Sequence, residues 1–160
     1  MEVIVNNKKY LVNLSKIGAV DIPHEFGKIY HFDLKNENEI TGEMDFYFEC
    51  YEFTAKLRKF KAKDNDGAKA LFIALRYFCF NNRSLMVESQ DLNETTGKRE
   101  FENFIDKFDD DNLNVDKSSK IGYTIYLFDE DDSFNNIKAS IIEKEYKQND
   151  LEFNIKEFIW

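Results

Sequence analysis

Hydrophobic and polar residues alternate in the first part of the chain, which is the pattern of strands that bury one face. The alternation covers residues 3–5, resumes at residues 10–14 after an Asn6-Asn7 turn, and returns in a third run at residues 29–34. These runs are separated by polar residues. The pattern therefore predicts three short strands joined by polar turns.

The clearest alternation lies in EMDFYFECYEF, residues 43–53. One face of this predicted strand takes Met44, Phe46, Phe48 and Cys50. The other, wetter face takes Asp45, Glu49 and, in part, Tyr47 and Tyr51. The following segment TAKLRKFKA, residues 54–62, predicts a hairpin partner for this strand. Its alternation fails near Arg58 and Lys59, so we expect a register break there.

The spacing of apolar residues becomes helical in DNDGAKALFIALRYFCFNN, residues 64–82. Apolar positions recur every three or four residues, at Ala68, Leu71, Phe72, Leu75, Phe78 and Cys79. Asp64 or Asp66 is expected to cap the first turn, and the asparagine pair 81–82 is expected to end the helix. A helix this apolar must be covered on most sides, so we expect it to lie against the sheet and to organise the fold.

The rest of the chain predicts shorter elements. Residues 84–89 and 122–130 indicate short strands, and residues 95–108 indicate a short amphipathic helix. The C-terminal segment 133–160 has patterns of both a hairpin and a helix. Alternation near its end favours a closing hairpin around residues 148–150, and both alternatives stay open.

Together these elements predict an α+β fold, in which a mostly antiparallel sheet packs on one central apolar helix, with one or two lesser helices. A length of 160 residues is within the range of one domain, so we expect residues 1–160 to form a single domain. With 16 Phe and 8 Tyr, its core should be rich in aromatic side chains. No apolar run approaches the roughly 20 residues that span a bilayer, and Glu2 is untypical of a signal peptide. We therefore expect a cytoplasmic protein without a membrane partner.

Charge is distributed unevenly along the chain, whose net charge is −9. Residues 86–160 carry 19 acidic and 9 basic side chains, whereas residues 1–60 carry 10 and 8. The acids are densest in two runs, at residues 109–116 and at residues 129–132. Such a surface attracts basic proteins and repels DNA, RNA and anionic membranes. We therefore expect a protein partner and no nucleic-acid partner, and we leave the oligomeric state open.

The acidic runs do not have the pattern of a calcium loop, which needs glycine at its sixth position. Loops that start at Asp109, Asp110 and Asp129 place Asn114, Val115 and Phe134 there. Zinc is also unexpected, because the available ligands have spacings that match no standard site: His24, His31, Cys50 and Cys79. The two cysteines are expected to be buried free thiols.

The chain also has none of the common catalytic patterns. Its six glycines are too scattered for a phosphate-binding loop, and no nucleophile motif is present. We therefore predict that the protein is not an enzyme, with no catalytic residues, no metal ligands and no cofactor. A basic stripe at residues 56–63 is interpreted as a lysine-protected edge strand or as an internal complement of the acidic half.

A short motif carries one resemblance. Cys50 lies on the strand that precedes the helix, and the helix opens with the pattern D-x-x-x-A-L-x-x-A-L, formed by Asp66, Ala70, Leu71, Ala74 and Leu75. In these features residues 45–85 resemble a class of uncharacterised small bacterial domains. The resemblance implies a strand followed by a buried helix, and it implies no catalytic residues.

The overall character of the chain carries a second resemblance. A small, acidic, single-domain chain looks like the immunity proteins of bacterial polymorphic-toxin and contact-dependent inhibition systems. This resemblance implies a binding protein that neutralises a cognate toxin, for example by covering the basic active-site surface of a nuclease with an acidic patch. Two other functions stay open, namely a phage or mobile-element inhibitor that mimics DNA, and a small enzyme.

The expected partner-binding residues follow from the acidic runs. The acids are Asp109, Asp110, Asp111, Asp116, Asp129, Glu130, Asp131 and Asp132. Phe108 and Phe134 flank them and would serve as aromatic anchors beside the charges. The alternative is that these aromatic side chains only close the core beneath two solvated loops.

Overall fold

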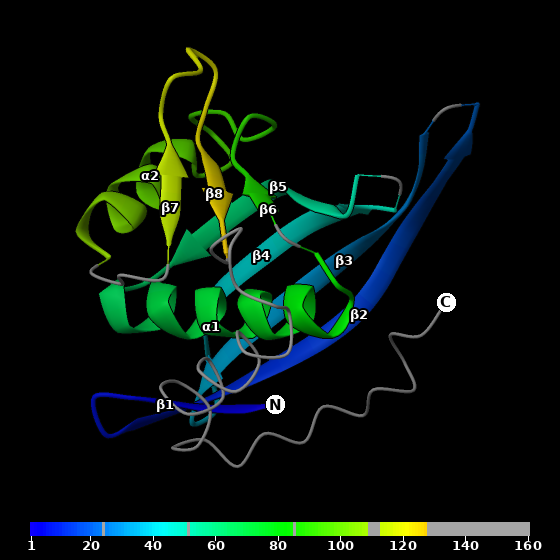
Figure 1. Cartoon of the computed structure of the whole chain (residues 1–160). Helices are drawn as coiled ribbons and strands as arrows, with labels where there is room; N and C mark the ends of the chain where they lie inside the picture. Colours follow the sequence, from blue (N-terminus) through cyan, green and yellow to red (C-terminus); the bar gives the residue numbers. More distant parts are fainter. Residues whose placement is uncertain (24, 51, 85, 109–112, 128–160) are drawn as a thin grey trace.

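The computed structural model describes the chain except for residues 24, 51, 85, 109–112 and 128–160 (Figure 1). In the described part, two helices and one eight-stranded sheet form an α+β fold, as the sequence predicted. The elements in chain order are β1 (Glu2–Val5), β2 (Lys8–Ile22), β3 (Glu25–Asn36), β4 (Glu39–Glu49), β5 (Thr54–Ala62), α1 (Asn65–Asn81), β6 (Met86–Glu88), α2 (Lys98–Lys107), β7 (Asn114–Asp116) and β8 (Thr124–Tyr126).

The sheet is mostly antiparallel, with the strand order β1-β2-β3-β4-β5-β6-β8-β7. Strands β1 to β5 are consecutive antiparallel neighbours, and β6 then joins β5 in parallel. A parallel pair needs a crossover connection, and this connection contains α1. Figure 1 shows α1 lying across one side of the five-stranded meander. We call this side the helix face and the other side of β1 to β5 the open face.

The ends of the early elements have the local geometry that their residues favour. Asn6 and Asn7 both have positive φ, 49° and 63°, as a tight turn between two strands requires. Asp64 is the N-cap of α1, and its Oδ1 accepts a hydrogen bond of 2.8 Å from the Gly67 backbone N–H. Asn82 is the C-cap. The predicted limits of this helix are therefore confirmed.

Aromatic rings connect α1 to the helix face of the sheet. The ring of Phe78 lies 4.9 Å from the rings of both Tyr30 and Phe46, and 5.6 Å from that of Phe48, measured between centroids. These spacings are those of favourable aromatic pairs. Phe78 is thus the point at which the central helix locks onto β3 and β4.

The open face of β4 departs from the prediction in two places. Tyr47 and Glu49 were expected on a wetter face, but their exposed fractions are only 1% and 4%. The Tyr47 ring lies against Gly27 of β3, and the Arg58 guanidinium carbon is 5.2 Å from the ring centroid. Glu49 accepts a 2.7 Å hydrogen bond from the Glu52 backbone N–H. On an open face a side chain without neighbours is exposed to water. Tyr47 and Glu49 are buried because these neighbouring groups cover them.

The register break predicted in β5 is present. The register passes from Asp45 paired with Lys59 to Phe46 paired with Leu57, which leaves Arg58 as the extra residue. Such a bulge lets a strand keep its apolar side chains on one face on both sides of the irregularity.

The basic stripe on β5 does not protect a sheet edge, which was one of the two interpretations offered for it. β5 lies between β4 and β6, so it is not an edge strand. In the described part of the chain, three of the stripe's lysines form ion pairs with acids of the first half. The pairs are Lys56 with Glu52 at 3.2 Å, Lys59 with Glu43 at 2.8 Å and Lys63 with Glu39 at 3.1 Å.

Three further predictions concern cysteines and the C-terminus. Both cysteines are free thiols, but only Cys79 is fully buried. Cys50 follows the end of β4 and is half-buried. The closing hairpin predicted around residues 148–150 lies outside the described residues, as does its helical alternative for residues 133–160.

Candidate protein-binding edge

The last strand of the sheet lies within the acidic segment that the sequence indicated as a loop. β7 pairs with β8, and Asn114 lies opposite Tyr126 while Asp116 lies opposite Thr124. β7 has no second strand neighbour among the described residues, so it forms one edge of the sheet. A three-residue strand with a single apolar side chain, Val115, gives too short an alternation to recognise from the sequence.

Both acidic runs connect to the same end of this ladder. Asp111, the last acid of the first run before the strand, precedes Asn114 by three positions, and Asp129, the first acid of the second run, follows Tyr126 by three positions. Asn114 and Tyr126 are register partners. Since a residue spans at most about 3.6 Å along the chain, each run begins within roughly 11 Å of the same strand end. The pairing of β7 with β8 thus places side by side the two strand ends from which these runs continue along the chain.

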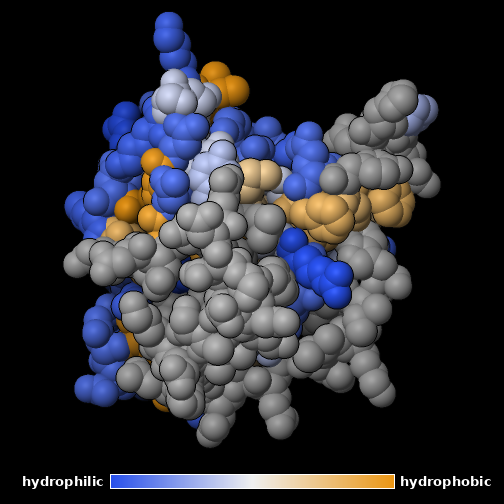
Figure 2. Space-filling view, in the orientation of Figure 1, coloured by the Kyte–Doolittle hydropathy of each residue, from blue (hydrophilic) through white to orange (hydrophobic). Residues whose placement is uncertain are grey.

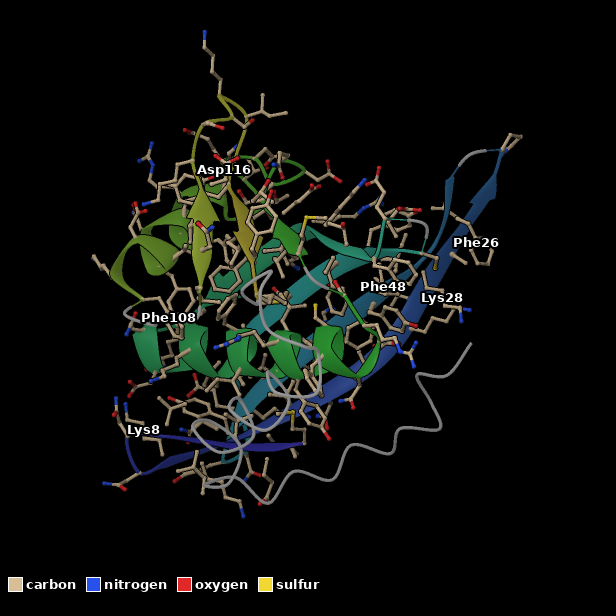
Figure 3. All side chains as sticks on the ribbon, in the orientation of Figure 1. Lys8, Phe26, Lys28, Phe48, Phe108 and Asp116 are labelled. Atoms are coloured by element: carbon tan, nitrogen blue, oxygen red, sulfur yellow. The ribbon has the colours of Figure 1, made fainter. Side chains whose placement is uncertain are left out.

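The structure describes Phe108 and Asp116 among the predicted site residues. The others lie outside the described residues, namely Asp109, Asp110, Asp111, Asp129, Glu130, Asp131, Asp132 and Phe134. Figure 3 shows Phe108 beside α1 and Asp116 at the far end of β7. The structure therefore does not bring these two side chains together.

Phe108 has the contacts of a core residue. It is the C-cap of α2, and its ring centroid lies 5.3 Å from those of both Phe72 and Phe104. The Lys69 ammonium nitrogen lies 5.9 Å from its ring centroid, within the range of a cation–π contact. The half-buried ring closes the gap between α1 and α2, and only its exposed part is accessible to a partner.

Asp116 is an exposed carboxylate at the edge of the sheet. Its Oδ1 accepts a hydrogen bond of 2.8 Å from the Ser118 backbone N–H. Hydrogen bonds from the Ser118 side chain and backbone lower the pKa of Asp116, because they stabilise the charged form. Asp116 is therefore ionised at neutral pH, with its side chain oriented by the turn that follows β7.

Asp106, which the sequence did not indicate as a site residue, links β7 and β8 to α2 through hydrogen bonds. The carboxylate of Asp106 on α2 accepts hydrogen bonds from the Lys117 ammonium group and, at 3.2 Å, from the Tyr123 hydroxyl. The Lys117 ammonium also lies 5.2 Å from the Tyr123 ring centroid. Asp106 occurs in the helical pattern of residues 95–108, but nothing in that pattern indicates its two partners.

Ser89 also links the start of β8 to α2. The Ser89 hydroxyl donates to Glu102 of α2 at 2.8 Å and accepts from the Tyr123 backbone N–H at 2.7 Å. Ser89 is fully buried, so these bonds are shielded from water. The β7–β8 ladder is thus attached to α2 at two places, both at the end where Asp116 pairs with Thr124. Figure 2 shows mostly hydrophilic residues on this end of the molecule.

Groups suited to chemistry elsewhere are few in the described part of the chain. No set of three or more His, Cys, Asp or Glu side chains there has a metal-binding arrangement. Burial raises the pKa of the Cys50 thiol to about 11 and that of Cys79 to about 12, so neither forms a thiolate readily at neutral pH. His31 lies between two carboxylates, Asp33 and Asp45, on the open face.

A cleft of about 530 Å³ lies near the start of α1 and is lined by polar side chains. Two of its cations already have carboxylate partners. Lys8 pairs with Asp66 at 2.8 Å, and Lys63 pairs with Glu39 at 3.1 Å. The cleft therefore has a less distinct chemical preference than the acidic edge.

None of the helices described in the structure is both long and apolar enough to cross a membrane. No protein-family model, curated protein or solved structure matches the chain.

Proposed function

We propose that this chain is a binding protein that neutralises a cognate protein toxin, as an immunity protein does. Its acidic edge, defined as residues 109–111, Asp116 and residues 129–132, would cover a basic surface of the toxin. The active-site groove of a nuclease is one such surface. The observation that carries the proposal is the attachment of both acidic runs at one end of the β7–β8 ladder.

Electrostatics supports a basic partner for this edge. Residues 109–111 and 129–132 carry seven carboxylates and continue from neighbouring strand ends, in a half of the chain with 19 acidic and 9 basic side chains. Such clustering steers a cationic partner toward the edge and speeds association. Salt screens this attraction, because the Debye length is about 8 Å at physiological ionic strength, so the proposed binding should weaken as the salt concentration rises.

The hydrogen bonds that attach β7 and β8 to α2 also support a binding role. The Asp106 and Ser89 bonds tie β7 and β8 to α2 through Lys117 and Tyr123, at the end of the ladder opposite to Asn114 and Tyr126. The two strands that lead to the acidic runs are therefore held at their far ends. Because β7 and β8 are already held in place, they need not be ordered when a partner binds, which favours affinity. The open face is less suitable for a basic partner because several of its acids already pair with cations of the sheet.

The proposal is tested by capturing partners from the native cell with the immobilised full chain. Capture is compared at about 50 mM and about 500 mM salt, and bound proteins are identified by mass spectrometry. One variant neutralises the first run, D109N/D110N/D111N. The matched control changes the net charge equally on exposed acids of the β1 and β3–β4 region, E2Q/E37Q/E39Q.

We expect a basic protein that binds the wild type and the control at low salt and binds the first variant about tenfold more weakly. Co-expression of the chain should then restore growth of cells that express that protein. Equal binding by both variants, or binding without rescue of growth, contradicts the proposal. If duplex DNA competes for the captured protein, a DNA-mimicking inhibitor becomes the better assignment.

A further inference from the structure

The opposite end of the sheet has a strand edge that β1 covers only in part. β2 runs from Lys8 to Ile22, and β3 pairs with one edge of it from Tyr10 to Ile22. On its other edge, β1 pairs with residues 8–11, and Met1 exchanges main-chain hydrogen bonds with Val12. From residue 13 to residue 22, no strand of the described chain pairs with this edge.

A strand edge that lacks a partner among the described residues presents a row of main-chain N–H and C=O groups to any extended chain. Figure 1 shows β2 and β3 continuing well beyond the end of β1. The edge is also mostly uncharged, because residues 13–22 contain only Lys16 and Asp21 as charged residues. Ile17, near the middle of this stretch, is 56% exposed. We call residues 13–22 of β2 the free edge.

A bulge divides the free edge into two halves. The alternation of side chains between the two faces of the sheet is reversed from one half to the other. Before it, Ser15 pairs with His31, and after it Gly18 pairs with Ile29, which leaves Ile17 as the extra residue. His31 and Ile29 are two positions apart on β3, so they lie on the same face of the sheet. Odd-numbered residues of β2 therefore lie on the open face before Ile17, and even-numbered residues lie there after it.

We propose that the free edge binds the same edge of a second copy of this chain in antiparallel orientation, which would extend the sheet across a two-fold axis. Pairing residue 13 with residue 22 of the second copy covers the whole free edge on both chains. In this register Ser15 lies opposite Val20, and Lys16 lies opposite Ala19. Each pair joins residues of the same face, because the bulges of the two chains lie next to each other and reverse the alternation at the same place.

The side chains on the free edge suit this arrangement. The exposed Ile17 side chains of the two copies meet next to the axis, where each can cover the other. The two Lys16 residues are not opposite each other, because each faces the small Ala19 of the other copy. A lysine and a bulge are features that often protect a free edge. In this register neither prevents pairing, since the bulges coincide and the lysines are offset.

The association state of the full chain tests the proposal. Sedimentation equilibrium from about 1 to about 300 µM should show the mass rising from the 19.0 kDa of one chain toward twice that value. Ile17→Lys places two like charges beside the axis, and we expect it to raise the dimer dissociation constant at least about tenfold. The matched control is Ile40→Lys on β4, where Ile40 is 59% exposed, and it should change the constant less than about twofold.

Amide hydrogen exchange distinguishes pairing of the free edge from association through another surface. In dilute single chains the outward amides of residues 13–22 should exchange rapidly, and at high concentration they should become protected while the β7 amides remain unchanged. A single-chain mass up to the highest concentration overturns the proposal. So does a dimer that Ile17→Lys leaves intact, or protection of these amides already in single chains. No toxin is present in these measurements, so they do not depend on the proposed function.

Discussion

The helix face and the open face of the sheet are built by alternate residues of the same strands, yet different interactions hold them. On β4, Met44, Phe46 and Phe48 of the helix face are almost completely buried. Their neighbours Glu43 and Asp45 on the open face are half-buried and pair with Lys59 and His31. One face is therefore held by close packing, and the other by charges that largely compensate one another.

This difference bears on the choice of the proposed binding surface. Exposed or half-exposed ion pairs contribute little to stability, and their charges already have partners within the sheet. The acidic edge beside β7 instead carries acids in excess of the lysines near it in sequence. A charged surface whose charges pair within the sheet, as on the open face, has less electrostatic attraction left for a partner, and this is why the proposal places the binding surface at the acidic edge.

Removing an aromatic ring from the helix face should have the largest effect. The Phe46 ring is completely buried and lies against the rings of Tyr30, Phe32 and Phe78. We expect Phe46→Ala to lower the free energy of unfolding by about 3–5 kcal/mol, because it loses burial and leaves a cavity. Urea denaturation followed by circular dichroism measures the change.

The control for this prediction is Leu11→Ala on the open face, where Leu11 is 42% exposed. It should lower the free energy of unfolding by less than about 1 kcal/mol. Equal losses for the two variants would show that packing does not separate the two faces.

Gly27 is an exception to the difference between the two faces. It lies on the open face, but we expect a larger side chain there to be as destabilising as a change in the core. A Cβ at Gly27 would lie 2.3 Å from the Phe48 carbonyl oxygen and 2.5 Å from the Tyr47 ring. We expect Gly27→Ala to lower the free energy of unfolding by about 1–3 kcal/mol through overpacking. The same denaturation measurement applies.

Gly18 of β2 provides the matched control, since the nearest atoms to a Cβ there would all belong to the Ile29 side chain, with its terminal carbon closest at 3.3 Å. Gly18→Ala should change stability by no more than about 1 kcal/mol in either direction, because alanine also restricts the unfolded chain. A tolerated Gly27→Ala, with the Tyr47 ring still buried, would contradict the role given to this glycine.

The elements that local pattern determines were predictable from the sequence. Alternation indicated the strands of the meander, although β2 and β3 extend well beyond the predicted residues 10–14 and 29–34. Helical spacing with Asp64 and Asn82 at its limits gave α1. The failure of alternation at Arg58 gave the bulge in β5. The burial of Tyr47 was not predictable, because it depends on a glycine 20 positions away in sequence, Gly27 on the neighbouring strand.

The candidate site was predictable only in its residue types. Both acidic runs are visible in the sequence, but their common point of attachment depends on Asn114 pairing with Tyr126. That pairing joins two three-residue strands across an intervening loop, and such short strands have little intrinsic preference. The core contacts of Phe108 likewise depend on how α2 packs against α1, which helical periodicity alone does not specify.

The smallest predicted effect concerns the charges of the open face and their response to pH. His31 Nε2 lies 2.9 Å from Asp33 Oδ1, and Nδ1 makes a short contact with Asp45 Oδ1. Partial burial by itself lowers the pKa of His31, but hydrogen bonds and charge from the two aspartates outweigh it and raise the pKa. Both ring nitrogens can donate to a carboxylate only when the imidazole is protonated.

A pKa that is raised in the folded state gives stability that is complete below the unfolded value of about 6.5. This stability is lost as pH rises through the folded pKa. We therefore expect the difference in unfolding free energy between the wild type and His31→Gln to be larger at about pH 5.5 than at about pH 8.5, by less than about 1 kcal/mol after solvent screening. Taking the difference cancels other groups that titrate in this range, such as the Met1 amino group, whose pKa burial lowers. Urea denaturation across the pH range measures it. A difference that is independent of pH would mean that the two aspartates do not hold the histidine in its charged form, and that the open face is less compensated than its geometry indicates.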